Sequence, residues 1–240
     1  MKIYCRHLLG LFVAGLAAIP GLGLAQTAKL NVRGTKQYIQ GTNLAWLDTR
    51  YGTDFGLNPL HPDWGNGYNS AHVDAYFKDI KNMNLNVVRV WLCESLDGFT
   101  FDSSGNPTGL STQFLTNLDD MVARANTYKL SLYFTWFNGN DLGTAWNQAL
   151  PSGAKIQNFV DNATSRTAVI NNVIGALATR YKTNSAIFGY DLINESNIGS
   201  DSGYYTWADM RTFGQAAASK IHSVAPGTQV TRSFPLNQVK

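Results

Sequence analysis

The run Ala186-Ile187-Phe188-Gly189-Tyr190-Asp191-Leu192-Ile193-Asn194-Glu195 is apolar along most of its length and becomes polar at its end. A short, nearly continuous hydrophobic run of this kind is typical of a β-strand that is buried on both faces. Two earlier runs, at residues 86–92 and 130–137, have the same character. We therefore expect all three to lie inside one parallel sheet.

Helical patterns separate these runs. Apolar residues recur at helical spacing within residues 73–83, 114–125, 169–177 and 207–221. Further strand patterns stand before the first helix, at residues 38–46, and after the last, at residues 229–234. This alternation predicts repeated βα units in one domain over residues 26–240, because each return to a parallel strand needs a covering helix.

The loops of these units differ in length. Those that follow the strands are long (residues 47–70, 94–110 and 138–164), whereas those that precede them are short, as at residues 83–85 and 182–184. A (β/α)8 barrel builds its active site from the loops at the carboxyl ends of its strands, so the asymmetry favours that α/β fold. A doubly wound open sheet is the alternative, but no Gly-rich phosphate-binding motif follows a strand.

The N-terminus predicts export. Lys2 and Arg6 precede an uncharged stretch at residues 8–24 that ends in small residues, so we expect residues 1–25 to be a cleaved signal peptide. The mature protein would be secreted or periplasmic, with no membrane association. Without Lys2 and Arg6, 17 of the 19 basic groups remain against 16 acidic groups. This balance gives no strong attraction to nucleic acid or anionic lipid.

Cysteine and histidine positions argue against a disulfide or a metal centre. Only Cys93 remains after residue 25, so no intrachain disulfide is possible. His61, His72 and His222 lie far apart in the sequence. We therefore expect neither a metal site nor a cofactor.

Glutamate is rare in the mature chain and is the candidate for acid–base chemistry. Residues 26–240 contain two glutamates, Glu94 and Glu195, against fourteen aspartates. Glu195 ends the run quoted above, where a carboxyl against an apolar strand end would have a raised pKa and could act as a general acid. Asn194 beside it can donate and accept hydrogen bonds to a substrate hydroxyl. The alternative is a solvated glutamate at the start of a helix.

Tryptophans lie near the predicted strand ends. Trp46 follows the first strand pattern, and Trp136 lies at the end of the third. Flat indole rings suit the apolar faces of sugar rings, so both are candidates for substrate binding. Ordinary core packing is the alternative for each.

These motifs together resemble glycoside hydrolase family 5, in the retaining (β/α)8 clan of cellulases and mannanases. The matching residues are Asn194-Glu195, Arg89 within the second strand, and Gly41-Thr42-Asn43 before Trp46, and the resemblance covers residues 30–235. It implies that Glu195 is the general acid/base, that Asn194 contacts the sugar 2-hydroxyl and that Arg89 orients the nucleophile. It also implies a β-linked polysaccharide or oligosaccharide substrate of mannan or cellulose type, with Asn43 among the contacts.

The sequence departs from that family in two ways. A His is usual near the end of strand three, where this sequence reads Thr135-Trp136-Phe137-Asn138, so we expect Trp136 or Asn138 to line the site instead. The family nucleophile is a Glu that ends strand seven, and this sequence stops at Lys240, just after the fifth strand pattern. We therefore expect a C-terminally truncated (β/α)8 barrel with its first five strands.

The second departure bears on activity. A retaining glycosidase needs two carboxyl groups about 5 Å apart, so we predict that the chain by itself is inactive or poorly soluble. A noncatalytic carbohydrate-binding or degenerate barrel fragment is the competing hypothesis. Glu94, after the second strand, is expected to bind sugar hydroxyls or meet solvent. A further alternative pairs it with Glu195 at the roughly 6.5–9.5 Å of an inverting enzyme.

Overall fold

The computed structural model describes residues 29–48, 51–143, 150, 152–153 and 155–232. The predicted signal peptide at residues 1–25 lies outside this part of the chain. The central sheet has five strands, which are all parallel: β3 (Gly41–Leu44), β4 (Val87–Trp91), β7 (Ser131–Asn138), β8 (Ile187–Asn194) and β9 (Gln229–Thr231). Each expected strand pattern therefore contains a strand.

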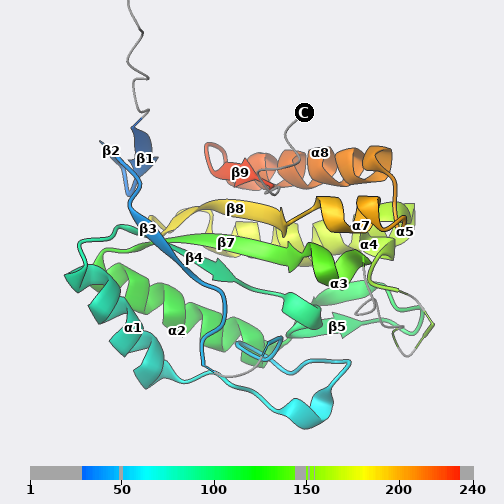
Figure 1. Ribbon diagram of the computed structural model, residues 1–240, viewed down its shortest axis with the longest axis horizontal. Helices are drawn as coiled ribbons and strands as arrows, with labels where there is room; N and C mark the ends of the chain where they lie inside the picture. The colour runs from blue at the N-terminus through cyan, green and yellow to red at the C-terminus, as the bar shows by residue number, and fades with distance from the viewer. Residues whose placement is uncertain (1–28, 49–50, 144–149, 151, 154, 233–240) are drawn as a thin grey trace, which may run out of the picture.

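The strand order in the sheet decides between the two fold classes. It runs β3-β4-β7-β8-β9, so each new strand is added to the same edge (Figure 1). A doubly wound sheet instead reverses its order at a switch point, whereas a (β/α) barrel adds its strands in sequence around one axis. The prediction of a barrel-type α/β fold with five strands is confirmed, and the doubly wound alternative is wrong.

The predicted helices connect these strands. α1 (Ser70–Asn82) joins β3 to β4, α2 (Thr112–Tyr128) joins β4 to β7, and α8 (Trp207–Val224) joins β8 to β9 (Figure 1). Between β7 and β8 the chain forms α5 (Ala163–Ala168), the π-helical segment η3 (Val169–Ile174) and α6 (Gly175–Tyr181). Side-chain caps fix the helix starts, as where Asn69 accepts from the backbone of α1 and where Thr206 and Asp209 cap α8 reciprocally.

The hydrophobic core lies between the helices and one face of the sheet. Side chains alternate between the two faces of a strand, and one set of alternate positions in β4, β7 and β8 is apolar and buried. The helices bury one stripe each against it. The main members of this core are Val88, Val90, Leu132, Phe134, Tyr190 and Leu192 from the strands, and Phe77, Phe114, Leu118, Met121, Phe213 and Ala217 from the helices.

The opposite face of the sheet is polar. We call it the inner face. Its polar side chains occupy the strand positions between the apolar core residues, and they hydrogen-bond to one another across strands. They are Asn43, Arg89, Tyr133, Thr135, Asp191 and Thr231. This arrangement brings polar groups from all five strands together on one face of the sheet.

Two antiparallel hairpins were not predicted. β1 (Leu30–Val32) and β2 (Thr35–Gln37) precede the sheet, and β5 (Phe99–Phe101) and β6 (Pro107–Leu110) lie inside the expected loop at residues 94–110. Short helical turns also follow several strands: η1 (Pro62–Trp64), η2 (Glu94–Leu96), α3 (Gly139–Gly143), α4 (Asn158–Asp161) and α7 (Asn197–Asp201). Elements of three to five residues carry too little periodicity to be recognised in the sequence.

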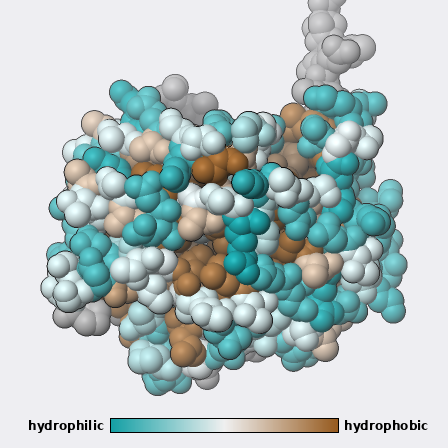
Figure 2. Space-filling view, turned by 180° about the vertical axis from the view of Figure 1, so that it is seen from behind, coloured by the Kyte–Doolittle hydropathy of each residue, from teal (hydrophilic) through white to brown (hydrophobic). Residues whose placement is uncertain are grey.

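The surface of the molecule is mixed in character. Figure 2 shows separate hydrophobic patches among polar atoms on the face that lies behind the view of Figure 1. Among the residues that the structure describes, none of the helices combines the length and the hydrophobicity needed to cross a membrane.

Candidate functional site

Two strands end side by side at the carboxyl edge of the sheet. Asn138 ends β7, Asn194 ends β8, and the two are register partners. The short helices α3 and α7 follow directly and pack together at this edge (Figure 1). The backbones approach so closely here that a Cβ on Gly139 would lie 2.2 Å from the carbonyl oxygen of Glu195. Only glycine fits at this position.

Glu195 stands at the turn between β8 and α7. Its φ of +50° lies in the left-handed region, which a residue with a side chain seldom adopts. Such conformations persist only where the surrounding structure imposes them, and they concentrate at functional sites. The side chain is half-buried. The structure thus puts Glu195 where the sequence predicted, at the lip of the fourth parallel strand.

Arg89 connects the inner face to the end of β8. Its Nη2 donates to Asp191 Oδ2 at 2.6 Å and to Asn194 Oδ1 at 3.1 Å, and its Nη1 donates to Asn43 Oδ1 at 3.4 Å. The guanidinium also lies over the Trp91 ring, 5.2 Å from its centroid. Arg89, Asn43 and Asn194, three of the predicted site residues, therefore form one cluster. The planar fork of arginine suits such simultaneous recognition of several oxygens.

Asp191 is a site residue that the sequence analysis missed. It is 1% exposed and, besides Arg89, lies 3.5 Å from the hydroxyls of Thr135 and Thr231. A signal was present, because a buried carboxylate must be paired. Asp191 is the one charged residue within β8, and Arg89 is the one charged residue within β4. The pairing follows once both strands are placed in one sheet.

Trp46 forms an exposed aromatic surface beside this cluster. Its side chain is 53% exposed, and its ring meets those of Tyr51 and Trp91 edge-on at centroid distances of 6.4 and 6.5 Å. Trp91 is fixed in turn, since its Nε1 donates to Asn43 Oδ1 at 3.1 Å. Trp46 thus has the accessibility that a sugar-stacking residue needs.

Glu94 lies beneath Trp46 and is 4% exposed. Its Oε2 accepts the indole N–H of Trp46 at 2.6 Å, and its Oε1 accepts from Asn138 Nδ2 at 3.4 Å. Asn138 Oδ1 accepts from Asn194 Nδ2, also at 3.4 Å. The expectation that Glu94 meets solvent or sugar hydroxyls is corrected, because protein donors occupy both carboxylate oxygens. Asn138 is buried between the two clusters and joins them.

The expectation for Trp136 is also corrected. The sequence analysis proposed it as a second sugar platform, but its side chain is 0% exposed and stacks on Tyr190 at 5.9 Å. It belongs to the hydrophobic core, which was the alternative. One signal was present, because Trp136 shares a strand face with Leu132 and Phe134, whereas Trp46 lies beyond the end of its strand. The neighbouring elements cover one of them and leave the other accessible.

Several buried acids fix the loops around the site. Asp54 accepts the backbone N–H of Leu47 at 3.0 Å, and Asp97 accepts those of Phe55 and Gly56 at 2.7 and 2.8 Å. Asp141 accepts from the backbone of Ser95 at 3.0 Å and from the hydroxyl of Tyr51. These carboxyls order the backbone of the long loops that follow the strands.

Burial dominates the electrostatics of these acids. Burial and, after it, the nearby charge of Asp141 raise the pKa of Glu94 to about 9. Desolvation also raises the pKa of Asp54 and of Asp97 to about 7, and that of Asp141 to about 6. Charged carboxylates are poorly solvated in an apolar surrounding, so each of these groups keeps its proton to a higher pH than in water.

No metal centre is formed within the described ranges. Among these residues, no group of three His, Cys, Asp or Glu side chains is arranged to hold an ion. Cys93 is buried with a free thiol, and His61 stacks on Trp64 at 3.8 Å.

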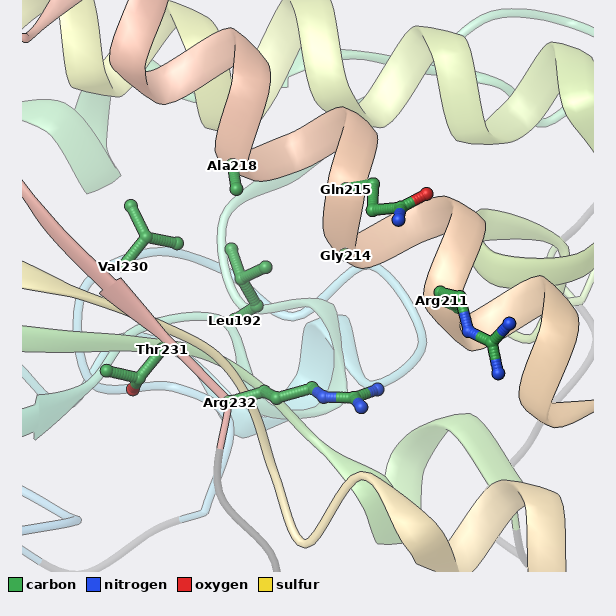
Figure 3. Close-up of a pocket in the computed structure, with 8 residues that line it drawn as sticks. All are labelled: Leu192, Arg211, Gly214, Gln215, Ala218, Val230, Thr231 and Arg232. Carbon is green, nitrogen blue, oxygen red and sulfur yellow. The ribbon is translucent and has the colours of Figure 1, made fainter.

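A separate hollow of about 550 Å³ lies between α8 and the last two strands. Figure 3 shows Leu192 and Val230 on one side of it and Ala218, Gln215 and Arg211 of α8 on the other. Leu192 and Val230 belong to the strand face that packs against the helices, so the hollow is on the helical side of the sheet, and Thr231 and Arg232 lie at its β9 edge. Burial lowers the pKa of Arg232 at its rim, and the charge of Arg211 lowers it further.

Comparison with known proteins links this geometry to one family. Residues 47–231 match the family model described as Cellulase (glycosyl hydrolase family 5). A probable mannan endo-1,4-beta-mannosidase F of Neosartorya fischeri is 24% identical over 220 residues, which cover 85% of this chain and 44% of that protein. Mannan endo-1,4-beta-mannosidase A of Aspergillus aculeatus is 26% identical over 188 residues, covering 73% of this chain and 45% of that protein.

Solved structures agree on the fold. A beta-mannanase from the blue mussel Mytilus edulis superposes with a TM-score of 0.67 at 22% identity, covering 86% of this chain and 61% of that chain. A beta-1,4-mannanase from the sea hare Aplysia kurodai gives 0.67 at 19% identity, with 87% and 63% covered. The chain thus spans less than half of the length of these curated relatives and about three fifths of the length of these solved chains.

Proposed function

This chain belongs to glycosyl hydrolase family 5, and from that premise we propose that Glu195 is the general acid/base of an enzyme that hydrolyses β-1,4-linked mannan. The observation that carries the proposal is the Arg89–Asn194 hydrogen bond of 3.1 Å. It joins the half-buried guanidinium of the inner face to the residue that precedes Glu195. In this arrangement Glu195 protonates the leaving glycosidic oxygen and then activates water.

The neighbouring groups support distinct roles. Arg89 fixes the Asn194 side chain by donating to its oxygen, so the amide has one preferred orientation toward a substrate hydroxyl. Asn43 faces the same guanidinium and the indole of Trp91. Trp46 supplies an apolar surface of the kind that stacks on sugar rings. Together they line a surface with a polar end and an aromatic end.

The substrate proposal rests on the relatives. Those named above are mannan endo-1,4-beta-mannosidases and beta-mannanases, whereas the family model is described as a cellulase. We therefore place β-1,4-mannan first and a cellulose-type glucan second. A polymeric substrate of this kind is consistent with export of the protein by the leader pattern at residues 1–25.

A retaining mechanism requires a second carboxyl about 5 Å from the first. Glu94 does not suit this role, because it is buried with both oxygens bound by Trp46 and Asn138. Asp191 does not suit it either, because it is tied to Arg89. We propose that the nucleophile comes from outside the described residues and that the described part supplies the acid/base and the aromatic surface.

Oligosaccharide binding by the whole chain tests this proposal. We expect β-1,4-mannohexaose to bind in a calorimetric titration and to perturb the NMR signals of Asn194 and Trp46, with maltohexaose as the non-β control. Glu195→Gln should retain this binding, because the substituted amide has the same shape. Failure of both mannohexaose and cellohexaose to bind would contradict the proposal.

The mechanism needs a protein that contains the second carboxyl. In a longer protein that contains this chain together with the second carboxyl, Glu195→Gln should lower kcat by at least about a hundredfold, as expected for loss of a general acid. Proton NMR of fresh products should show the β-anomer first. Products of α-configuration would contradict retention, and binding without turnover in the longer protein would favour the noncatalytic alternative.

A further inference from the structure

The contact between Glu94 and Trp46 links a buried acid to an exposed ring. The indole N–H lies 2.6 Å from Glu94 Oε2, while the ring itself is 53% exposed. We propose that Glu94 is a positioning residue that fixes the Trp46 indole as one wall of the glycan-binding surface. This inference rests on the proposed function and adds to it the residue that sets the orientation of the platform.

The chemistry of the pair admits one arrangement. An indole N–H can only donate, so Glu94 Oε2 is the acceptor in this pair. Their separation of 2.6 Å is at the short end of N–H···O hydrogen bonds, so the contact is close. Without this contact, an exposed indole would exchange between rotamers, and ordering it on binding would reduce the affinity.

The backbone around Glu94 is rigid enough to serve as a support. Ser95 and Leu96, which follow it in η2, have φ values of +50° and +68°. The backbone N–H of Ser95 donates to the buried carboxylate of Asp141 at 3.0 Å, and that of Asp97 donates to the Glu94 carbonyl at 3.0 Å. These contacts leave the Glu94 side chain little freedom to follow a moving ring.

A chain of hydrogen bonds connects Glu94 to the proposed catalytic residues. Asn138 donates to Glu94 Oε1, Asn194 donates to Asn138, and Arg89 donates to Asn194. Every donor in this chain points toward Glu94, so the carboxylate at one end and the guanidinium at the other orient both amides. The aromatic platform and the Asn194-Glu195 turn are therefore kept in a fixed relation.

The first experiment needs no ligand. In a 1H–15N spectrum of the whole chain, the Trp46 indole signal is identified by its absence in Trp46→Phe. We expect Glu94→Ala to move this signal upfield and to speed its exchange with water, and Glu94→Gln, which keeps one acceptor oxygen, to give an intermediate effect. Asp119→Asn is the control, because this acid lies on α2 and hydrogen-bonds to Arg180 and Tyr181, outside the loops around the site, and it should leave the signal in place.

The second experiment measures mannohexaose affinity. Loss of an oriented aromatic contact should weaken binding roughly two- to tenfold. We expect Glu94→Ala and Trp46→Ala to fall in this range, the double variant to be no weaker than Trp46→Ala, and Asp119→Asn to bind normally. A urea titration of each variant shows whether it is folded. If Glu94→Ala is not folded, Glu94→Gln is used in its place.

The outcomes separate the two claims. If the wild-type chain binds mannohexaose and the Glu94 variants bind equally well, the inference is overturned and the proposed function stands. If the wild-type chain binds no β-1,4-glycan, the proposed function fails, and the inferred positioning of Trp46 is judged on the indole signal alone. An indole signal that does not respond to Glu94→Ala or Glu94→Gln overturns the inference in either case.

Discussion

At the scale of single residues, the Arg89–Asp191 pair has the largest energetic consequence. The carboxylate is 1% exposed and the guanidinium side chain 21% exposed, at a distance of 2.6 Å. Arg89→Leu would leave the buried carboxylate without its guanidinium, a defect that typically costs about 3–5 kcal/mol. We expect the free energy of unfolding, measured by urea titration, to fall by that amount.

A double variant shows whether the loss of stability comes from the ion pair itself. Arg89→Leu with Asp191→Asn removes the charge that Arg89→Leu leaves behind, so it should recover a large part of the lost stability. Arg89→Lys keeps a charge but not the planar fork, and should fall between wild type and Arg89→Leu. If the double variant were less stable than Arg89→Leu, the ion pair would not be the source of the effect.

At the scale of elements, the approach of β7 to the turn after β8 depends on Gly139. A Cβ there would lie 2.2 Å from the Glu195 carbonyl oxygen and 3.0 Å from that of Asn194. Both contacts are to backbone, which cannot move aside as a side chain can. Gly139→Ala should therefore destabilise the protein by about 1–3 kcal/mol, as overpacking does, and shift the NMR signals of Asn194 and Glu195.

Gly214 supplies the control for this change. It lies within α8, where an added Cβ meets no atom within 4 Å. Alanine is favoured over glycine in a helix by roughly 0.5–1 kcal/mol, so Gly214→Ala should raise the urea midpoint. If Gly139→Ala behaved like Gly214→Ala, the close approach of the two strand ends would not constrain the site.

At the scale of the whole molecule, the buried acids set the response to pH. Folding raises the pKa of Glu94 from 4.5 to about 9 and those of Asp54 and Asp97 from 3.8 to about 7. Between the unfolded and folded values the native state binds more protons than the unfolded state, so stability falls as pH rises. We expect the urea midpoint to decrease steadily from about pH 5 to about pH 9.

Glu94→Gln tests the upper end of this range. Among these acids Glu94 has the highest folded pKa, about 9. Its replacement should therefore flatten the curve between about pH 7 and pH 9 and leave, between about pH 5 and pH 7, only the slope that Asp54 and Asp97 contribute. Exposed carboxyls such as Asp119, whose pKa hydrogen bonding from Arg180 lowers, lose their contribution only as the pH falls below about 4. A midpoint that rises with pH would contradict the assignment.

The sequence by itself determined the parallel βα repeat, since periodicity is a local property of the chain and strands and helices differ in it. It also placed Asn194 and Glu195 at a strand end, because polar residues that end an apolar strand are visible without a structure, and the family resemblance singled out Arg89. The five parallel strands and the four helical regions that connect them lie where these patterns predicted.

Only the tertiary structure decided which side chains meet. Arg89 reaches Asp191 past β7, over a separation of 102 residues, and Trp46 meets Glu94 over 48. It also decided that Trp136 is buried while Trp46 is exposed, because exposure depends on which distant elements cover a side chain. Periodicity states which residues share a face of one strand, whereas the neighbours across that face come from the register and packing of the whole sheet.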